Sequence, residues 1–266
     1  MKISQAHEDF LRKHKRKQLF IRFTRYMILI VFLALWEVAA RTGIIDPFIT
    51  SSPSGIVSTI VRLWREDNLL MHIGVTMYET CMGFILGTAI GTFIAVLMWW
   101  SDTLCKILDP YLVVLNALPK IALGPLLIVW IGSGTESIIV MALLISLVVT
   151  IMTVLSGFVE ENSQKKLLMD TLGATKLQLF FYAVLPSAVP TIVSALKLSV
   201  GMSWVGVIVG EYLVSKAGLG YLIVYGGQVF KLDLVMASIV ILCILAALMY
   251  YAVAAMEVAL RKWRTK

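Results

Sequence analysis

Three long uncharged apolar runs constrain this chain more than any other feature. They cover residues 80–100, 137–159 and 234–256, and no Asp, Glu, Lys or Arg interrupts them. Each run is long enough to cross the hydrocarbon core of a bilayer, which takes roughly 20 apolar residues in a helix. Because the apolar residues are continuous rather than alternating, the runs predict membrane helices and not the strands of an outer-membrane barrel.

Three further apolar segments tolerate one or two charged side chains each. They are residues 26–40 with Glu37, residues 111–134 with Lys120, and residues 190–213 with Lys197 and Glu211. Over the whole chain of 266 residues, 59% are hydrophobic and only 15% are charged, which excludes an ordinary soluble enzyme. We therefore expect an all-α, polytopic membrane protein with about six transmembrane helices.

The Lys and Arg residues predict the orientation of the chain. Counted with both termini inside, sixteen lie in inner segments and five in outer segments. Cytoplasmic segments are enriched in Lys and Arg, so we expect both termini in the cytoplasm of a bacterial cell, and an even number of spans. The predicted organisation is a basic arm (1–25), a transmembrane domain (26–260) and a cytoplasmic tail (261–266). We expect the arm to contact the lipid bilayer rather than nucleic acid.

The predicted inner loop over residues 160–187, which we call the knob, has the pattern of two short helices. Gly173 follows the first stretch, 164–172, where a left-handed residue ends a helix. Thr175 is a suitable N-cap for a second helix, and its apolar residues recur at helical spacing up to Pro186, where we expect the helix to end. The knob is either a surface hairpin that closes the bundle or a docking element for a cytoplasmic partner.

The knob resembles the EAA loop of the permease subunits of ATP-binding-cassette (ABC) importers. The matching residues are Asp170, Thr171, Leu172, Gly173, Ala174, Thr175, Leu185 and Pro186. Leu167, Leu168 and Met169 stand where the family has Glu-Ala-Ala, so its acidic residue is missing. Further short motifs in the family's order extend the resemblance over about residues 50–260 and favour the nitrate, sulfonate and taurine branch.

The resemblance implies a permease subunit that moves a small solute by alternating access, such as a sulfonate, nitrate, a taurine-like compound or a thiamine precursor. It also implies a homodimer, two cytoplasmic ATPase subunits bound through the knob, and an extracytoplasmic substrate-binding protein. The sequence has no G-x-x-x-x-G-K-[ST] phosphate loop. We therefore expect ATP and Mg²⁺ on the partner ATPase, with no cofactor, catalytic residue or metal site on this chain.

Side chains that are charged or aromatic within the spans are the candidates for the translocation path. Lys120 lies between two prolines, which free backbone groups where a helix lines a cavity; an internally paired lysine is the alternative. Trp204 and Glu211 are seven residues apart on one helix face, directed either to a dimer cavity or to packing. Glu79 opens the second span, and we expect it to pair with Lys120 or to meet solvent.

Glycine patterns predict two further features. Gly83, Gly87 and Gly91 place small residues on one helix face, for close packing within the subunit or between subunits. The glycine-rich outer segment 214–235 predicts a tightly folded or re-entrant segment, which forms a gate or docking surface or packs on the bundle.

Two other classes of protein compete with a permease subunit. A self-contained secondary transporter or channel would also use broken spans and an intramembrane lysine. A membrane-embedded enzyme would need a nucleophile–base pair or a metal set. The histidines, His7, His14 and His72, lie near the N-terminus or in a predicted loop, which argues against a buried metal centre.

Overall fold

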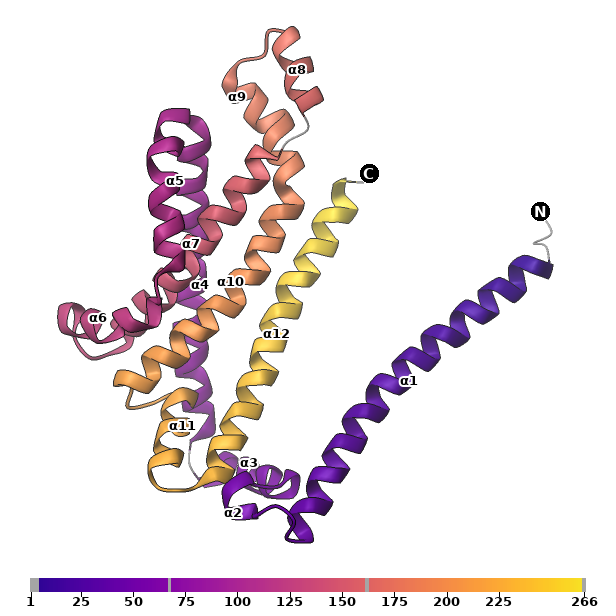
Figure 1. Ribbon diagram of the computed structural model, residues 1–266, viewed down its shortest axis with the longest axis vertical. Coiled ribbons are helices and arrows are strands. Elements are labelled where there is room, and N and C mark those ends of the chain that lie inside the picture. Colours follow the sequence, from indigo (N-terminus) through magenta and orange to yellow (C-terminus); the bar gives the residue numbers. More distant parts are fainter. Residues whose placement is uncertain (1–4, 67, 161–162, 265–266) are drawn as a thin grey trace.

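The structure is a computed structural model that describes the backbone of residues 5–66, 68–160 and 163–264, and the side chains of residues 13–66, 68–160 and 167–258. Its centre is a bundle of α4 (Leu69–Trp100), α7 (Thr135–Val159), α10 (Leu185–Val214) and α12 (Leu232–Arg264) (Figure 1). α7 packs along both α4 and α10, and α12 packs on α10. Within the described ranges, five helices are long and apolar enough to cross a membrane, or six if one sharply bent pair of helices counts as a span. This agrees with the predicted fold.

Small residues bring α4 and α10 close to α7. A Cβ added to Gly83 would collide with Ala142 of α7, and Gly87 and Gly91 repeat this close approach one and two turns further on. Gly206 of α10 approaches the backbone of the same Ala142. The glycine spacing therefore serves packing within the subunit, the first of the two alternatives, and it fixes the positions of the three helices.

The segment predicted as one span over residues 111–134 is bent. α5 (Asp102–Ala117) is followed by a 3-10 turn, η1 (Lys120–Leu123), and by α6 (Gly124–Ile131), with an 87° bend between the two halves. Leu118 has an extended backbone (ψ 135°) because the following Pro119 disfavours the helical conformation of the residue before it. The prolines were expected to interrupt this span, and the break lies at Pro119.

α1 (Gln5–Arg41) stands apart from the bundle over most of its length (Figure 1). It joins the predicted arm and the first span in one helix, and the span is not buried within the subunit. Its end contacts α2 (Pro47–Thr50) and α3 (Pro53–Glu66). There Glu37 accepts hydrogen bonds from the Ser54 amide (3.0 Å) and from Arg41 Nε (2.7 Å), which ties α1 to α3. Side chains 1–12 of the predicted arm, and those of the tail 261–266, lie outside the described residues.

The knob and the described ends of α1 and α12 point to one end of the molecule (Figure 1). α2, α3 and α11 (Leu219–Gln228) gather at the opposite end. We call these the knob end and the outer end. The predicted even number of spans corresponds to counting the bent pair as one span, and the location of both termini in the cytoplasm stays a prediction.

Candidate functional site

The knob begins with α8 (Ser163–Thr171), which ends at Gly173. Gly173 has φ +73°, the left-handed region that glycine adopts without strain. The Gly173 amide donates to the carbonyl of Asp170 (3.1 Å), and the Ala174 amide donates to the carbonyl of Met169 (3.0 Å). This pair of bonds is a Schellman motif, which satisfies the last carbonyls of the helix. The predicted helix end is confirmed.

A second helix, α9 (Lys176–Leu179), begins at Thr175, also as predicted. The Thr175 hydroxyl accepts a hydrogen bond from the Gln178 amide (3.3 Å), and the Gln178 side chain accepts one from the Thr175 amide (2.8 Å). This capping box satisfies two backbone donors that the first turn of a helix leaves free. The two helices of the knob are thus set by residues close together in sequence.

Pro186 does not end the second helix, and that prediction was wrong. α9 continues through a π-helical segment, η2 (Phe180–Val184), into α10, so that Lys176–Val214 is one helix of 39 residues. The Leu185 amide donates to the carbonyl of Phe180, five residues earlier. A proline ring in an α-helix meets the carbonyl four residues before it, and the wider π turn makes room for the ring. The knob is therefore continuous with a membrane span.

An aromatic cluster anchors the knob to the ends of α4 and α7. Phe180 is 5% exposed at the centre of this cluster. Its ring centroid lies 5.0 to 6.1 Å from those of Trp99, Trp100, Phe158 and Phe181. Aromatic pairs at such separations are favourable beyond the area that they bury. The start of the long helix is therefore fixed to two neighbouring spans.

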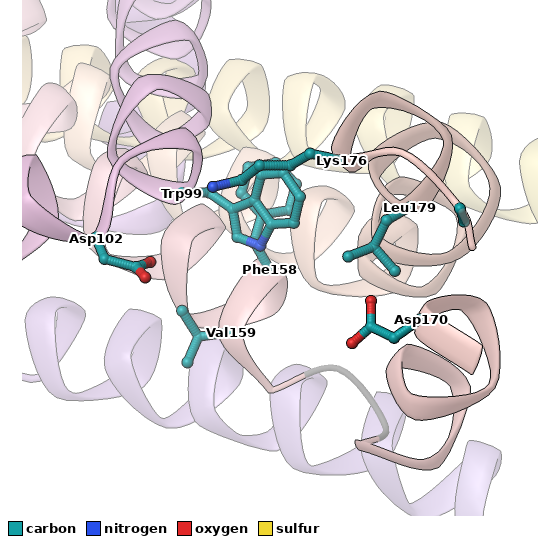
Figure 2. Close-up of a pocket in the computed structure, with 8 residues that line it drawn as sticks. Trp99, Asp102, Phe158, Val159, Asp170, Lys176 and Leu179 are labelled. Carbon is teal, nitrogen blue, oxygen red and sulfur yellow. The ribbon is translucent and has the colours of Figure 1, made fainter. Parts of the chain in front are cut away.

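A cavity of about 440 Å³ lies between the knob and this anchor (Figure 2). Its walls are Trp99, Asp102, Phe158, Val159, Asp170, Ala174, Lys176 and Leu179. Lys176 Nζ donates to the carbonyl of Trp100 (2.7 Å) and lies 5.7 Å from the centre of the Trp99 ring. In the part of the chain that the structure describes, no ion pair engages Asp102 or Asp170. Both aspartates are exposed.

The tip of the knob exposes leucine side chains. Leu167, Leu168 and Leu172 are 66%, 59% and 73% exposed. Two of them stand where the EAA pattern has Glu and Ala. Apolar side chains gathered on an exposed surface mark an interaction site. The tip combines such a surface with the two carboxylates of the cavity.

The predicted path residues do not line one cavity. Lys120 lies at the bend after α5, where its Nζ donates to Asn116 Oδ1 (3.3 Å). Trp204 and Glu211 are 4% and 1% exposed, and face the interior of the subunit. Glu79 is 0% exposed and lies beside Glu211. Neither expectation for Glu79, a pair with Lys120 or contact with solvent, was right.

A buried network at the outer end, which sequence reasoning missed, joins α4, α10 and α11. The Glu211 carboxylate accepts hydrogen bonds from the Thr76 hydroxyl (2.6 Å) and from the Gly220 amide (2.5 Å). The Thr76 hydroxyl in turn accepts one from the Leu219 amide (2.8 Å). Thr76 and Glu211 are 135 residues apart, so no local pattern could indicate their contact.

The same network holds the glycine-rich outer segment. His72, expected in a loop, lies on α4 at 8% exposure, and its Nδ1 accepts a hydrogen bond from the Gly218 amide (3.0 Å). Gly218 has φ +110°, and a Cβ there would collide with the Glu211 carboxylate. Segment 214–235 is thus tightly folded and packed on the bundle, one of the predicted alternatives.

One ion pair joins two spans of the bundle. Lys197 of α10 pairs with Glu257 of α12, a residue for which the sequence predicted no role.

Comparison with known proteins adds the decisive observation. The family model described as "Binding-protein-dependent transport system inner membrane component" matches residues 87–265, which include both the knob and the Glu211 network. The chain belongs to this family. It is a multi-pass membrane protein and a permease subunit of an ABC importer, as the EAA-like loop indicated.

Relatives that are named as transport permeases match this chain over most of their own length. A probable ABC transporter permease of Haemophilus influenzae is 30% identical over 88% of this chain and 95% of its own. A formylaminopyrimidine transport permease of Halalkalibacterium halodurans is 30% identical over 90% of this chain and 95% of its own. A putative aliphatic sulfonates transport permease of Bacillus subtilis is 29% identical over 88% and 85%, respectively.

Solved structures share the fold. The inward-facing MetNI methionine ABC transporter matches with a TM-score of 0.64 at 20% identity, covering 72% of this chain and 95% of that one. A bacterial ABC transporter involved in alginate import matches with a TM-score of 0.62 at 15% identity, covering 95% and 98%. The second match extends the similarity of fold to almost the whole chain.

Proposed function

We propose that this subunit moves its solute across the bacterial cytoplasmic membrane by alternating access, driven through the knob by a separate ATPase. The observation that carries the proposal is the continuous helix Lys176–Val214. Its 39 residues correspond to about 58 Å at the rise of an α-helix, roughly twice the thickness of the hydrocarbon core. It begins in the knob and carries Glu211 near its other end. A displacement of the knob is therefore transmitted to the outer end by one element.

The surface of the knob supports docking of a cytoplasmic protein. The exposed leucines at the tip of the knob supply an apolar contact. Asp102 and Asp170, which form no ion pair among the described residues, supply acceptors for an Arg or Lys of the partner. We propose two ATPase subunits on a homodimer of this chain, with ATP and Mg²⁺ bound by the ATPases and no ATPase site here. An extracytoplasmic binding protein then delivers the solute at the outer end, and both termini lie in the cytoplasm.

The cargo that we propose is a small sulfonate, nitrate, a taurine-like compound or a thiamine precursor. The relatives named for formylaminopyrimidine and aliphatic sulfonates support this range. Among the predicted path residues, Lys120 is the one that we place on the path. It lies where the backbone is irregular, and it is partly exposed, whereas Glu79, Trp204 and Glu211 are buried inside the subunit.

Reconstitution in vesicles tests the proposal. The chain is co-expressed with the ATPase and binding protein encoded beside it, and uptake of labelled taurine, nitrate and formylaminopyrimidine is measured with and without internal ATP. We expect uptake of one of these solutes only when ATP and both partners are present. Equal uptake by the chain alone without ATP would instead identify a secondary transporter or channel.

A further inference from the structure

Two carboxyl groups lie next to each other inside the subunit. Glu79 of α4 is 0% exposed and Glu211 of α10 is 1% exposed, and their side chains are neighbours. The side chain of Thr135, at the start of α7, also lies near Glu79. A buried carboxylate is costly unless it is paired or hydrogen-bonded, and two adjacent carboxylates cannot readily both be ionised.

The two groups differ in their hydrogen-bond partners. Glu211 accepts from the Thr76 hydroxyl and from the Gly220 amide. It also faces the N-terminus of α11, a helix of 10 residues whose free amides favour an anion. These partners suit an ionised Glu211. By contrast, neither oxygen of Glu79 makes a hydrogen bond of standard geometry among the described residues, although the Thr135 side chain lies near them.

The titratable groups on the neighbouring elements do not form an ion pair with either carboxyl group among the described residues. The titratable groups that these elements contribute are His72 on α4, Glu136 on α7, Tyr212 on α10, Lys216 in the turn that follows and Tyr221 on α11. His72 Nδ1 accepts the hydrogen bond of the Gly218 amide.

We propose that Glu79 and Glu211 form a proton-binding site that holds one exchangeable proton. Glu79 keeps the proton as a carboxylic acid, and its O–H donates a hydrogen bond to the Glu211 carboxylate. Glu79 thereby gains a hydrogen bond, and the pair carries one negative charge instead of two. The remaining charge is the one that Thr76 and the N-terminus of α11 stabilise.

A cavity beside the pair gives the proton an exchange route. It has a volume of about 280 Å³ and is lined by Val75, Ser133, Gly134, Thr135, Ile138, Val214, Ser215, Lys216 and Ala217. Thr135 is both a wall of this cavity and a neighbour of Glu79. When Glu79 releases its proton to water in the cavity, two adjacent carboxylates remain. Their repulsion displaces Glu211 and weakens its hold on α11, so the proton stabilises the closed packing of the outer end.

Infrared spectroscopy of the permease–ATPase complex in lipid nanodiscs tests for the proton. We expect a protonated-carboxyl C=O band at neutral pH that disappears in Glu79→Gln. The matched control Glu136→Gln, an exposed acid on α7, should leave that band unchanged. The proposal is overturned if the band is absent from the wild type or persists in Glu79→Gln. It is also overturned if Na⁺ at constant pH removes the band, because a metal cation would then be the occupant.

Hydrogen exchange tests the consequence for α11. After correction for chemical exchange, we expect protection of the Leu219 and Gly220 amides to fall about tenfold at alkaline pH, the loss of roughly one hydrogen bond. Glu79→Gln, which imitates the protonated acid, should keep protection high at every pH. Glu211→Gln should lose protection at every pH, because a neutral amide replaces the carboxylate that accepts from both the Thr76 hydroxyl and the Gly220 amide. Identical pH profiles in Glu79→Gln and the wild type would contradict the proposal. Neither experiment depends on transport, so failure of the proposed function would leave these results unaffected.

Discussion

The knob end and the outer end each contain a glycine with positive φ, but the surroundings of the two glycines differ. Gly173 has φ +73° and open space where a Cβ would lie. Gly218 has φ +110°, and a Cβ there would strike the buried Glu211 carboxylate. The two helices of the knob are therefore shaped by local backbone geometry, while Phe180 anchors the base of the knob and the tip is exposed. The Gly218 turn at the outer end is held by contacts between distant segments.

Among the substitutions that distinguish the two ends, Gly218→Ala is expected to cause the largest loss of stability. The alanine must adopt a backbone conformation that only glycine adopts readily, and its Cβ collides with a packed site. We expect the free energy of unfolding to fall by about 3–5 kcal/mol. Gly173→Ala should cost only about 1–2 kcal/mol, the penalty of a left-handed residue without a collision. Thermal unfolding in detergent measures both. Equal losses at the two glycines would contradict the distinction between the ends.

A second prediction concerns the hydroxyl that bridges α10 and α11. Thr76→Val leaves the Leu219 amide and one Glu211 oxygen without a partner, so we expect a loss of about 2 kcal/mol and faster exchange of the Leu219 amide. Thr80→Val is the matched control, because the Thr80 hydroxyl bonds only to a carbonyl of its own helix. If both variants unfolded alike, the bridge would contribute nothing specific to the outer end.

A smaller and more local effect is expected in the knob. Thr175→Ala removes the N-cap of α9 and should cost about 1 kcal/mol. Because the knob is held locally, we expect faster proteolysis of the knob with little change in the melting temperature. Thr171→Ala serves as the control, since the Thr171 hydroxyl only donates to the carbonyl of Leu168 within its helix. A drop in melting temperature as large as that of Thr76→Val would show that the knob is not an independent unit.

The contrast between the ends also explains what the sequence could predict. Uncharged runs predicted the spans, and Gly173 and Thr175 predicted the helix end and the cap, because those signals lie within a few residues of the structure that they determine. Pro186 was misjudged because the π turn before it has no local signature. The Glu211 network could not be predicted, since its partners on α4 lie more than 130 residues away in sequence.

The central claim, that a separate ATPase drives the subunit through the tip of the knob, is tested most directly with Leu168→Glu. Leu168 is 59% exposed, so the change should leave the fold intact. Ile44→Glu is the control, an equivalent change at an 80% exposed residue of the outer end. The measurement is ATP hydrolysis by the ATPase co-purified with each variant. We expect Leu168→Glu to lose the ATPase and its solute-stimulated activity at an unchanged melting temperature, while Ile44→Glu retains both. If Leu168→Glu retained both the bound ATPase and its solute-stimulated ATP hydrolysis, the account would be contradicted.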